Sequence, residues 1–295
     1  MDKRKIILVI PYRGIGDLIF HIPLIRGLYK KYKSKIIIIT NSANKAKFIL
    51  QREIAVKKID YINFEREDQI KNSYKFLKKV NKFNADTCVL TAPSKRLVIP
   101  LFMTNVKNKI FFKKNNIKDL SKYIINQSIK EFPNINFVKK YDLTFNKKKI
   151  EKHKIFLSID SHHDQNNWNE SNFIDLTYEL LKNDNIKKIY INFSPTKTKL
   201  FDKIYKKFLK NKKIFFTFNQ KFNKIINIIN NCSTIIGNES GPACLGASYG
   251  KNVFSIYNPN TTNLSSKIIN KKIMYFNTKI LKSKNIIKKI SKNII

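Results

Sequence analysis

The sequence is 295 residues long and carries 59 Lys and Arg against 20 Asp and Glu, a formal net charge of +39 at pH 7. With 42% hydrophobic and 12% aromatic residues it can bury a substantial core, which excludes a disordered chain, and its length favours two domains of roughly 100–200 residues each. The charge favours a polyanionic partner such as nucleic acid, an anionic membrane or a phosphorylated glycolipid. The abundance of Lys, Ile and Asn leaves open that much of the charge is a solvated surface.

The first half of the chain reads as strands alternating with helices. Lys5–Ile10 is a β-branched run typical of a buried parallel strand. A turn over Pro11–Gly16 leads into an amphipathic helix over Asp17–Tyr32, which Pro23 is expected to bend or restart. Further elements follow in the same alternation, with strands at Lys35–Thr40, Ile59–Phe64, Thr87–Thr91 and Lys109–Phe112, and helices at Ala43–Gln51 and Gln69–Phe83.

Residues 133–153 are polar, basic and weakly periodic, so we place a connection there between domains at 1–150 and 151–295. The alternation then restarts, with strands at Lys154–Ile159, Lys188–Phe193, Lys213–Phe218, Thr234–Gly237 and Asn252–Tyr257, and helices at Glu170–Leu181, Lys199–Leu209, Phe222–Ile229 and Pro242–Tyr249. The tail, Lys279–Ile295, has apolar residues at helical spacing; it either packs across the body, on the N-terminal domain in one arrangement, or presents a basic face to a membrane. The pattern predicts two α/β domains with parallel sheets.

Ligands of such domains bind outside the carboxyl ends of the strands. The candidate loops are therefore those that follow strands, at Pro11–Asp17, Asp160–Trp168, Ser194–Lys197 and Gly237–Pro242. The first loop contains Gly14-Ile15-Gly16-Asp17, an incomplete dinucleotide fingerprint because Ile19 stands in place of the third Gly. Asp17 at the helix start is a candidate general base or a plain helix cap, and the spacing favours neither role.

The second motif is Gly237-Asn238-Glu239-Ser240-Gly241-Pro242. A strand, a sharp turn and a helix would place free backbone N–H groups at a helix N-terminus, which suits a phosphate or diphosphate. Ser240 could donate its hydroxyl to the same group, and Glu239 could face sugar hydroxyls. Pro242 fits the first helical turn, where its missing N–H costs nothing. The alternative is an ordinary capped helix.

The loop Ser161–Trp168 holds two of the four histidines and the only Trp. A metal site could be built from four side chains of this region, Asp160, His162, His163 and Asp164. Adjacent His residues rarely face one ion together, so a polar loop over a phosphate or sugar is the preferred interpretation. Trp168 is expected to anchor a core rather than to serve as a stacking platform.

The cysteines and the N-terminus bear on the cellular compartment. Cys88, Cys232 and Cys244 form no CxxC pair, so neither a disulfide framework nor a zinc site is indicated. The apolar run Ile6–Ile10 is too short for a signal peptide, and no apolar stretch approaches the ~20 residues that span a bilayer. We therefore expect a cytoplasmic protein whose membrane contact is peripheral.

Two stretches together resemble glycosyltransferase family 9, the ADP-heptose:lipopolysaccharide heptosyltransferases. Ile15–Leu24 (IGDLIFHIPL) is similar to the N-terminal signature of that family, a Gly-Asp pair, an apolar run, then Pro and Leu. Ile236–Lys251 (IGNESGPACLGASYGK) is similar to the C-terminal signature, and Asn258–Thr261 resembles the Gly-Pro-Thr that follows it. The resemblance implies the GT-B architecture, two Rossmann-like domains that face each other across a cleft.

The resemblance implies inverting, metal-independent transfer of heptose or a related sugar from a nucleotide-diphosphate donor such as ADP-heptose to a lipopolysaccharide or surface-glycan acceptor. Asp17 would deprotonate the acceptor hydroxyl. The residues implied on the acceptor side of the cleft are Arg13, Gly14, Gly16 and His21. The residues implied at the donor are Asn166, Ser194, Asn238, Glu239, Ser240, Gly241, Pro242 and Cys244. Apart from the nucleotide-sugar co-substrate, no cofactor and no metal are expected.

Three positions depart from the family pattern. Asn166 stands where the family has a Lys that contacts the donor phosphate, and losing that bond would cost ~1.5–3 kcal/mol. Glu239 and Cys244 replace the usual Asp and His. We therefore expect a peripheral glycosyltransferase on the cytoplasmic face of the inner membrane, with a different donor as one alternative and a non-catalytic basic protein that binds glycolipid or nucleic acid as another. Nucleic acid is not the expected partner, because the aromatic residues do not cluster as an RNA-binding signature; the oligomeric state stays open.

Overall fold

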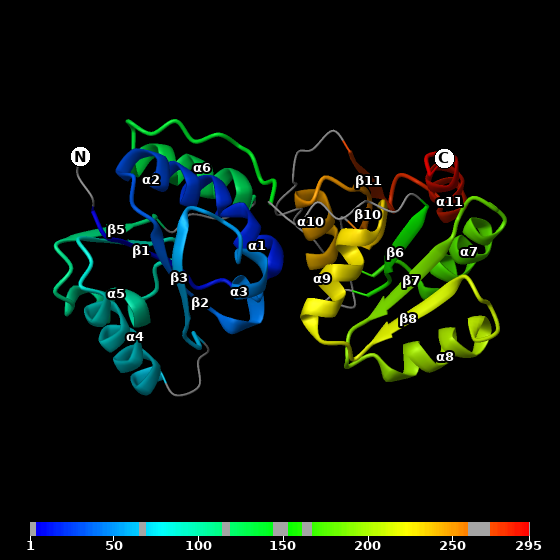
Figure 1. The fold of residues 1–295 in the computed structure, drawn as a ribbon, viewed down its shortest axis with the longest axis horizontal. Coiled ribbons are helices and arrows are strands. Elements are labelled where there is room, and N and C mark those ends of the chain that lie inside the picture. Colours follow the sequence, from blue (N-terminus) through cyan, green and yellow to red (C-terminus); the bar gives the residue numbers. More distant parts are fainter. Residues whose placement is uncertain are drawn as a thin grey trace. The chain divides into compact units, whose positions relative to one another are not determined.

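A computed structural model describes residues 4–64, 69–113, 119–143, 153–160, 167–258 and 272–294 (Figure 1). The chain divides into two compact units. Unit 1 comprises the described residues up to 143, and unit 2 comprises those from 153 onwards. The predicted domain boundary between residues 150 and 151 lies outside the described residues.

The described part of unit 1 is built on a five-stranded parallel sheet in the order β3-β2-β1-β4-β5. Its strands are β1 (Ile6–Ile10), β2 (Ile36–Thr40), β3 (Val56–Tyr61), β4 (Thr87–Leu90) and β5 (Asn108–Phe111). Its helices are α1 (Ile15–Phe20), α2 (Ile22–Tyr32), the 3₁₀ turn η1 (Ser42–Asn44), α3 (Ala46–Ile49), α4 (Gln69–Phe83), α5 (Lys95–Phe102) and α6 (Leu120–Glu131).

The Ile-rich strands of unit 1 are buried because helices cover both faces of the sheet. On β1, Ile7 and Val9 pack in one cluster with Phe76 of α4 and Leu101 of α5. Successive side chains of a strand point to opposite faces, so Leu8, which is also buried, faces the other layer. In that layer α6 packs against α1 and α2. This double coverage explains why β1 and β2 read as continuous apolar runs.

The described part of unit 2 has a six-stranded parallel sheet in the order β11-β10-β9-β6-β7-β8. Its strands are β6 (Lys154–Ser158), β7 (Lys188–Phe193), β8 (Ile214–Phe218), β9 (Thr234–Asn238), β10 (Asn252–Tyr257) and β11 (Ile273–Asn277). Its helices are α7 (Glu170–Leu181), α8 (Thr198–Phe208), α9 (Phe222–Asn231), α10 (Gly241–Ser248) and α11 (Ser283–Lys292).

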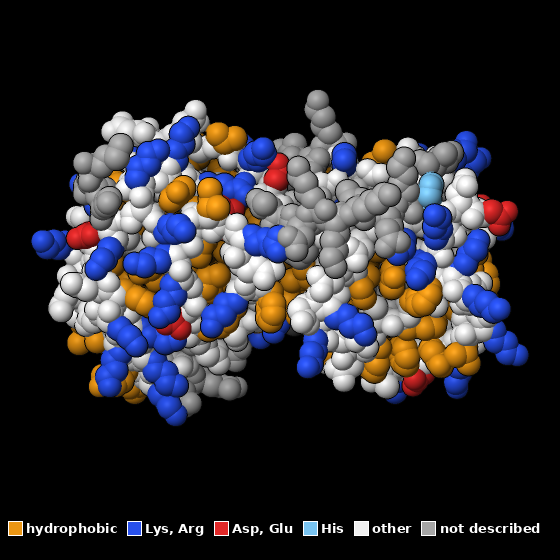
Figure 2. Space-filling view, viewed as in Figure 1, with side chains coloured by type: hydrophobic (Ala, Val, Ile, Leu, Met, Phe, Trp, Pro, Cys, Tyr) orange, Lys and Arg blue, Asp and Glu red, His pale blue; other side chains and the backbone are white. Residues whose placement is uncertain are grey.

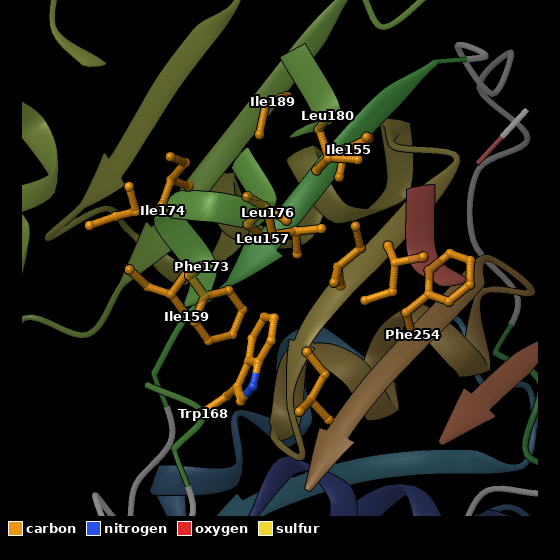
Figure 3. Close-up of a cluster of buried hydrophobic side chains, with 14 of the residues drawn as sticks. Ile155, Leu157, Ile159, Trp168, Phe173, Ile174, Leu176, Leu180, Ile189 and Phe254 are labelled. Atoms are coloured by element: carbon orange, nitrogen blue, oxygen red, sulfur yellow. The ribbon is translucent and has the colours of Figure 1, made fainter. Parts of the chain in front are cut away.

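The core of unit 2 joins the central strand β6 to helix α7 (Figure 3). Trp168 lies in this core with its ring edge-to-face on Phe173, at a centroid distance of 5.0 Å. Its indole Nε1–H donates to the Ser283 hydroxyl of α11 at 3.2 Å. The C-terminal helix α11 packs against α7 and contributes Ile286 and Ile290 to the same core. The apolar face of the amphipathic tail is therefore buried in the core of unit 2.

The prediction of two α/β domains with parallel sheets is confirmed, although some bounds differ. The helix predicted over Asp17–Tyr32 is two helices that meet at His21, and Pro23 lies in the first turn of the second one. Helix α1 begins at Ile15, so Asp17 is its third residue rather than its first. Strand β3 begins and ends three residues earlier than predicted, and β11 was not predicted.

Two further features are described directly. The three cysteines are free thiols, and Cys88 and Cys232 are buried. Within the described ranges, every helix is too short or too polar to cross a bilayer.

Candidate active site

Three of the four candidate loops follow a strand that borders the point where the strand order of its sheet reverses; the loop after β7 does not. In unit 1 this point lies between β1 and β4, which pair in parallel beside each other. In unit 2 it lies between β6 and β9. At such points the connections leave to opposite faces of the sheet and open a crevice at the carboxyl ends of the strands. The loops after β1 and β9 therefore hold the two glycine motifs at ligand-binding positions.

Asp17 lies in the first turn of α1, just beyond the carboxyl end of β1. Its Oδ2 accepts a hydrogen bond from the backbone N–H of Gly14 at 3.1 Å. A Cβ at Gly14 would stand 2.6 Å from that oxygen, so a larger residue there would require the carboxylate to shift. Burial raises the pKa of Asp17, and the bond from Gly14 offsets part of that rise. The side chain thus caps the helix and is also a carboxylate of raised basicity.

His21 is completely buried below Asp17, so it does not form part of the site surface. Its Nδ1 lies 2.6 Å from the carbonyl oxygen of Asp17. Because a carbonyl can only accept, Nδ1 carries the proton. The Nε2 of the neutral ring lies 3.0 Å from the Thr91 hydroxyl, which also lies 3.1 Å from the Val9 carbonyl and can donate its single proton to only one of the two. Burial lowers the pKa of His21 to about 4, which keeps the ring neutral. His21 ties the turn that bears Asp17 to the end of β4.

A pocket of about 220 Å³ opens at the same end of the unit 1 sheet. Its polar lining combines side chains that follow three strands with others from α4 and α5, namely Tyr12, Asn63, Asn72, Ser73, Ser94 and Arg96. The Tyr12 hydroxyl is buried and has no hydrogen-bond partner among the described residues. Burial raises its pKa, with smaller contributions from Tyr123 and Asp17. Tyr12 therefore joins the pocket to the surroundings of Asp17.

The exposed part of the first motif is small. Gly14 and Arg13 are exposed, and Gly16 is partly buried. These residues form the turn around Asp17, and Tyr12 of the same turn lines the pocket, whereas the rest of its polar lining comes from other segments. Sequence reasoning missed Ser94 and Arg96, although both lie in a segment that directly follows a predicted strand.

In unit 2, β9 ends at Asn238 and α10 begins at Gly241. Ser240 is the N-cap of α10 in an extended conformation, and its hydroxyl forms no cap bond within the described turn. It lies instead 3.4 Å from the Ser158 hydroxyl at the end of β6. The first backbone N–H groups of a helix lack intrahelical partners, so this N-terminus can receive an anion. Glu239, Gly241 and Cys244 are partly exposed around it.

Asn238 is fully buried and acts within the protein. Its Nδ2 donates to the Ile159 carbonyl at 2.8 Å and to Asn167 Oδ1 at 3.2 Å. Its Oδ1 accepts from the Trp168 backbone N–H at 2.8 Å. The whole amide is thus engaged in holding the loop after β6 against β9, so Asn238 shapes the site from below.

Ser194, another sequence candidate, is engaged with Asp160. The Asp160 Oδ2 accepts from both the backbone N–H and the hydroxyl of Ser194, each at 2.7 Å. The pKa of Asp160 is raised overall because the carboxyl is buried. The hydrogen bonds from Ser194 and the charge of the nearby Lys197 offset part of that rise. Lys197 and Asn167 also line an open pocket of about 300 Å³ beside Trp168. Lys197 is therefore a positive group at the ends of β6 and β7 that sequence reasoning did not single out.

The remaining candidates lie outside the described residues. These are Asn166, the loop histidines His162 and His163, and Asp164. In the part of the chain that the structure describes, no three His, Cys, Asp or Glu side chains gather as metal ligands would. Lys251, which ends the second signature, is buried and donates to the Asn230 carbonyl at the end of α9. That part of the signature is therefore structural.

Two Rossmann-type parallel sheets in one chain, with a carboxylate at one switch point and a helix N-terminus at the other, are features of the GT-B fold. A family model described as glycosyltransferase family 9 (heptosyltransferase) matches residues 121–293, more than half of the chain. The protein belongs to glycosyltransferase family 9. No curated protein sequence matches the chain.

Solved structures show the same fold at low sequence identity. A family 9 glycosyl transferase from Veillonella parvula is 14% identical, with a TM-score of 0.77 over 100% of this chain and 91% of its own. The E. coli ADP-heptose lipopolysaccharide heptosyltransferase II is 12% identical, with a TM-score of 0.76 over 98% of both chains. The E. coli heptosyltransferase WaaC with ADP is 11% identical, with a TM-score of 0.73 over 98% of this chain and 99% of its own.

Proposed function

We propose that the protein transfers heptose or a related sugar from a nucleotide-diphosphate donor to a lipopolysaccharide or surface-glycan acceptor, with inversion and without a metal. The observation that carries this proposal is Asp17, a carboxylate of raised pKa at the switch point of unit 1. A general base works best when its pKa approaches the working pH, and burial shifts Asp17 in that direction. The family membership supports a sugar hydroxyl as its proton donor.

The reaction is one displacement. Asp17 takes the proton of the acceptor hydroxyl as the acceptor oxygen attacks the anomeric carbon of the donor sugar. The bond from that carbon to the diphosphate oxygen breaks, and the nucleoside diphosphate leaves with the bonding electrons. The configuration at the anomeric carbon inverts because attack and departure occur on opposite faces. A positioned base of this kind contributes roughly 10²–10⁴ in rate.

The donor diphosphate would lie on the N-terminus of α10, near the Ser240 hydroxyl. Structural neighbours support this side of the proposal, since one is solved with ADP and another with an ADP-2-deoxy-2-fluoro heptose. The positive end of the helix dipole stabilises the negative charge that develops on the leaving group, so the proposed step requires no metal. Glu239 is one methylene longer than the family Asp and would accept from donor sugar hydroxyls.

Asn166 removes a positive charge that the family pattern would place on the donor phosphate. Lys197 lies close enough to Asp160 to offset part of the rise that burial causes in the pKa of that carboxyl, and it lines the pocket beside Asn167. We propose that Lys197 supplies part of the missing charge. The acceptor would enter from the pocket between Tyr12 and Arg96, as an anionic glycolipid or glycan at the cytoplasmic face of the inner membrane.

Calorimetric titration with ADP-, GDP- and UDP-sugars tests the donor assignment. We expect ADP-heptose or a related ADP-sugar to bind without added metal, and Lys197→Ala to weaken its binding by about tenfold. A matched control is Lys212→Ala, an exposed lysine outside the site. Preference for GDP or UDP would support the same enzyme class with another donor, while no binding to any nucleotide-sugar would contradict the proposal.

A further inference from the structure

We infer that helices α4 and α5 of unit 1 form the surface with which the protein docks onto an anionic lipid bilayer. We call the exposed side chains of these helices and of Met103, which follows α5, the α4–α5 surface. The inference extends the proposed function, but its argument uses only burial and charge, so it does not depend on the catalytic assignment.

The apolar side chains of α5 point in two directions. Leu97 and Leu101 are buried in the core of unit 1. Ile99, Phe102 and Met103 are exposed by 59%, 63% and 68%. Positions separated by three and four residues share one face of a helix, so these three form a continuous apolar stripe toward solvent. A surface helix normally carries polar residues there, and an apolar face in this position indicates an interaction surface.

Helix α4 extends the same character. Phe76 and Val80 are buried, whereas Ile70 and Tyr74, one turn apart, are exposed by 89% and 56%. The ammonium group of Lys78 lies 4.5 Å from the centre of the Tyr74 ring. Tyr side chains next to Lys suit the headgroup level of a bilayer, where an apolar ring and a charged group are both accommodated.

The two helices themselves carry only positive charge, although Glu65, Glu67 and Asp68 precede α4 in the sequence. Residues 69–113 contain ten Lys and Arg and a single acid, Asp86, and neither α4 nor α5 contains an acid. The exposed lysines on or beside the two helices are Lys71, Lys75, Lys78, Lys82, Lys95 and Lys107. In Figure 2, basic and hydrophobic side chains are interspersed over α4 and α5, at the lower left. Apolar residues among lysines complement a bilayer with anionic headgroups.

The basic helices of unit 2 provide a contrast. Helix α11 is equally rich in lysine, but its apolar residues Ile286 and Ile290 are buried in the core. On α8, Ile204 and Phe208 are likewise buried. Leu209 follows α8 and Ile280 precedes α11, and both are exposed. Hydrophobic side chains also gather on the face of unit 2 near α8 and β8 in Figure 2. Neither charge nor the presence of surface apolar residues alone selects the α4–α5 surface. It is distinguished by three apolar residues at helical spacing, each more than half exposed, on a helix whose start lines the unit 1 pocket.

The position of this surface relates it to the pocket of unit 1. Helix α4 contributes Asn72 and Ser73 to the pocket, while Ser94 and Arg96 come from the start of α5. The Ser73 hydroxyl donates to the Arg96 carbonyl at 3.1 Å, which fixes these ends of the two helices together. A bilayer that contacts α4 and α5 would therefore present a lipid-linked sugar beside the pocket that Tyr12 joins to Asp17.

Two other occupants fit less well. A second copy of the chain would bring two lysine-rich surfaces together, and like charges oppose such contact at short range. Nucleic acid would account for the lysines but not for exposed Ile, Phe and Met side chains, because its backbone offers them no apolar partner.

Vesicle co-sedimentation without donor or acceptor tests the inference. The vesicles are phosphatidylcholine alone, or equal parts of phosphatidylcholine and phosphatidylglycerol. We expect wild type to bind the anionic vesicles, and Ile99→Ser combined with Met103→Ser to weaken binding by about tenfold. The control is Leu209→Ser combined with Ile280→Ser, which removes two exposed apolar side chains from unit 2. A second pair compares Lys75→Glu and Lys78→Glu on α4 with Lys206→Glu and Lys207→Glu on α8.

Each outcome has a defined meaning once thermal unfolding confirms that the variants fold. Loss of binding only in the α4 and α5 variants supports the inference. Equal binding by all variants, or no preference for anionic vesicles, overturns it. A wild-type dimer that the Ile99 and Met103 changes convert to a monomer would instead identify a second copy as the occupant. Transfer to a soluble acceptor fragment, measured in parallel, should survive these changes, so the docking claim and the proposed function can fail separately.

Discussion

At the scale of single residues, Asp17 performs two tasks that the sequence presents as alternatives. It accepts from the Gly14 N–H as a helix cap, and burial holds the pKa of its carboxyl above the ordinary value. A purely structural cap would gain from a fully ionised carboxylate, because the positive end of a helix favours negative charge. The raised pKa therefore means that the bond from Gly14 offsets only part of the cost of burying the charge.

Replacing Asp17 by Asn separates these tasks through the pH dependence of stability. Because the pKa of Asp17 is raised in the folded state, protonation of its carboxyl stabilises the fold. This contribution is complete below the ordinary carboxyl pKa of 3.8 and is lost as the pH rises through the raised pKa. Asn keeps an acceptor for Gly14 but carries no charge. We expect Asp17→Asn to unfold at the same or a higher temperature than wild type at neutral pH, with a smaller difference in acid. A variant less stable at neutral pH would contradict the raised pKa.

His21 makes the opposite contribution. Its pKa is lowered to about 4 by burial, so its stabilising effect is complete above the ordinary value of 6.5 and is lost as the pH falls toward 4. The loss for wild type over that interval should be roughly 3 kcal/mol. In His21→Gln the amide can still donate to the Asp17 carbonyl and contact the Thr91 hydroxyl, but it does not titrate there. Urea unfolding at several pH values should show a flatter acid slope for the variant; parallel slopes would refute the neutral buried ring.

At the scale of elements, the order of strands and helices could be predicted because most strands are Ile-rich runs buried on both faces. The edge strands were harder. Only Phe276 of β11 is buried, so its sequence lacks the continuous apolar run that the central strands show. Strand β3 carries two exposed lysines, Lys57 and Lys58. Because these lysines interrupt the apolar pattern, the strand was predicted too late, over the more apolar residues that follow.

The candidate loops could be predicted from strand ends, but the direction of each side chain could not. Asn238 has the residue type of a ligand-binding amide, yet its three hydrogen bonds all stay inside unit 2. His21 stands four residues after Asp17, which places it one turn further along the chain, on the buried side. Whether a polar residue of a motif faces the site or is buried in a supporting role thus depends on tertiary packing, which the local sequence does not encode.

Gly237 illustrates how an element depends on a motif position. A Cβ at Gly237 would overlap the carbonyl oxygen of Ser158 on the paired strand β6. We expect Gly237→Ala to lower the free energy of unfolding by about 1–3 kcal/mol, because backbone rather than a flexible side chain must shift. Gly250→Asn is the control, since that glycine has φ +68 with open space around it and Asn tolerates this conformation. Denaturant unfolding of both variants checks the expectation; equal stability would contradict it.

At the scale of the whole molecule, the net charge of +39 is unevenly distributed along the sequence. Residues 69–113, for example, contain ten basic residues and a single acid. Exposed charges act over about 8 Å at physiological salt, so the total says little about any one site. The ten basic residues within 69–113 and Lys197 in unit 2 are the charges with a location that bears on function. Of the other described lysines, Lys154 and Lys251 are buried, and the rest are exposed or partly exposed.

The most direct test of the account is the transfer rate of Asp17→Asn, measured in single turnover beside calorimetric binding of the donor. The account predicts that transfer falls by roughly 10²–10⁴ while donor affinity stays at the wild-type value, because Asp17 acts on the acceptor hydroxyl and the donor is bound by unit 2. A variant that transfers sugar at the wild-type rate would contradict the assignment of Asp17 as the base.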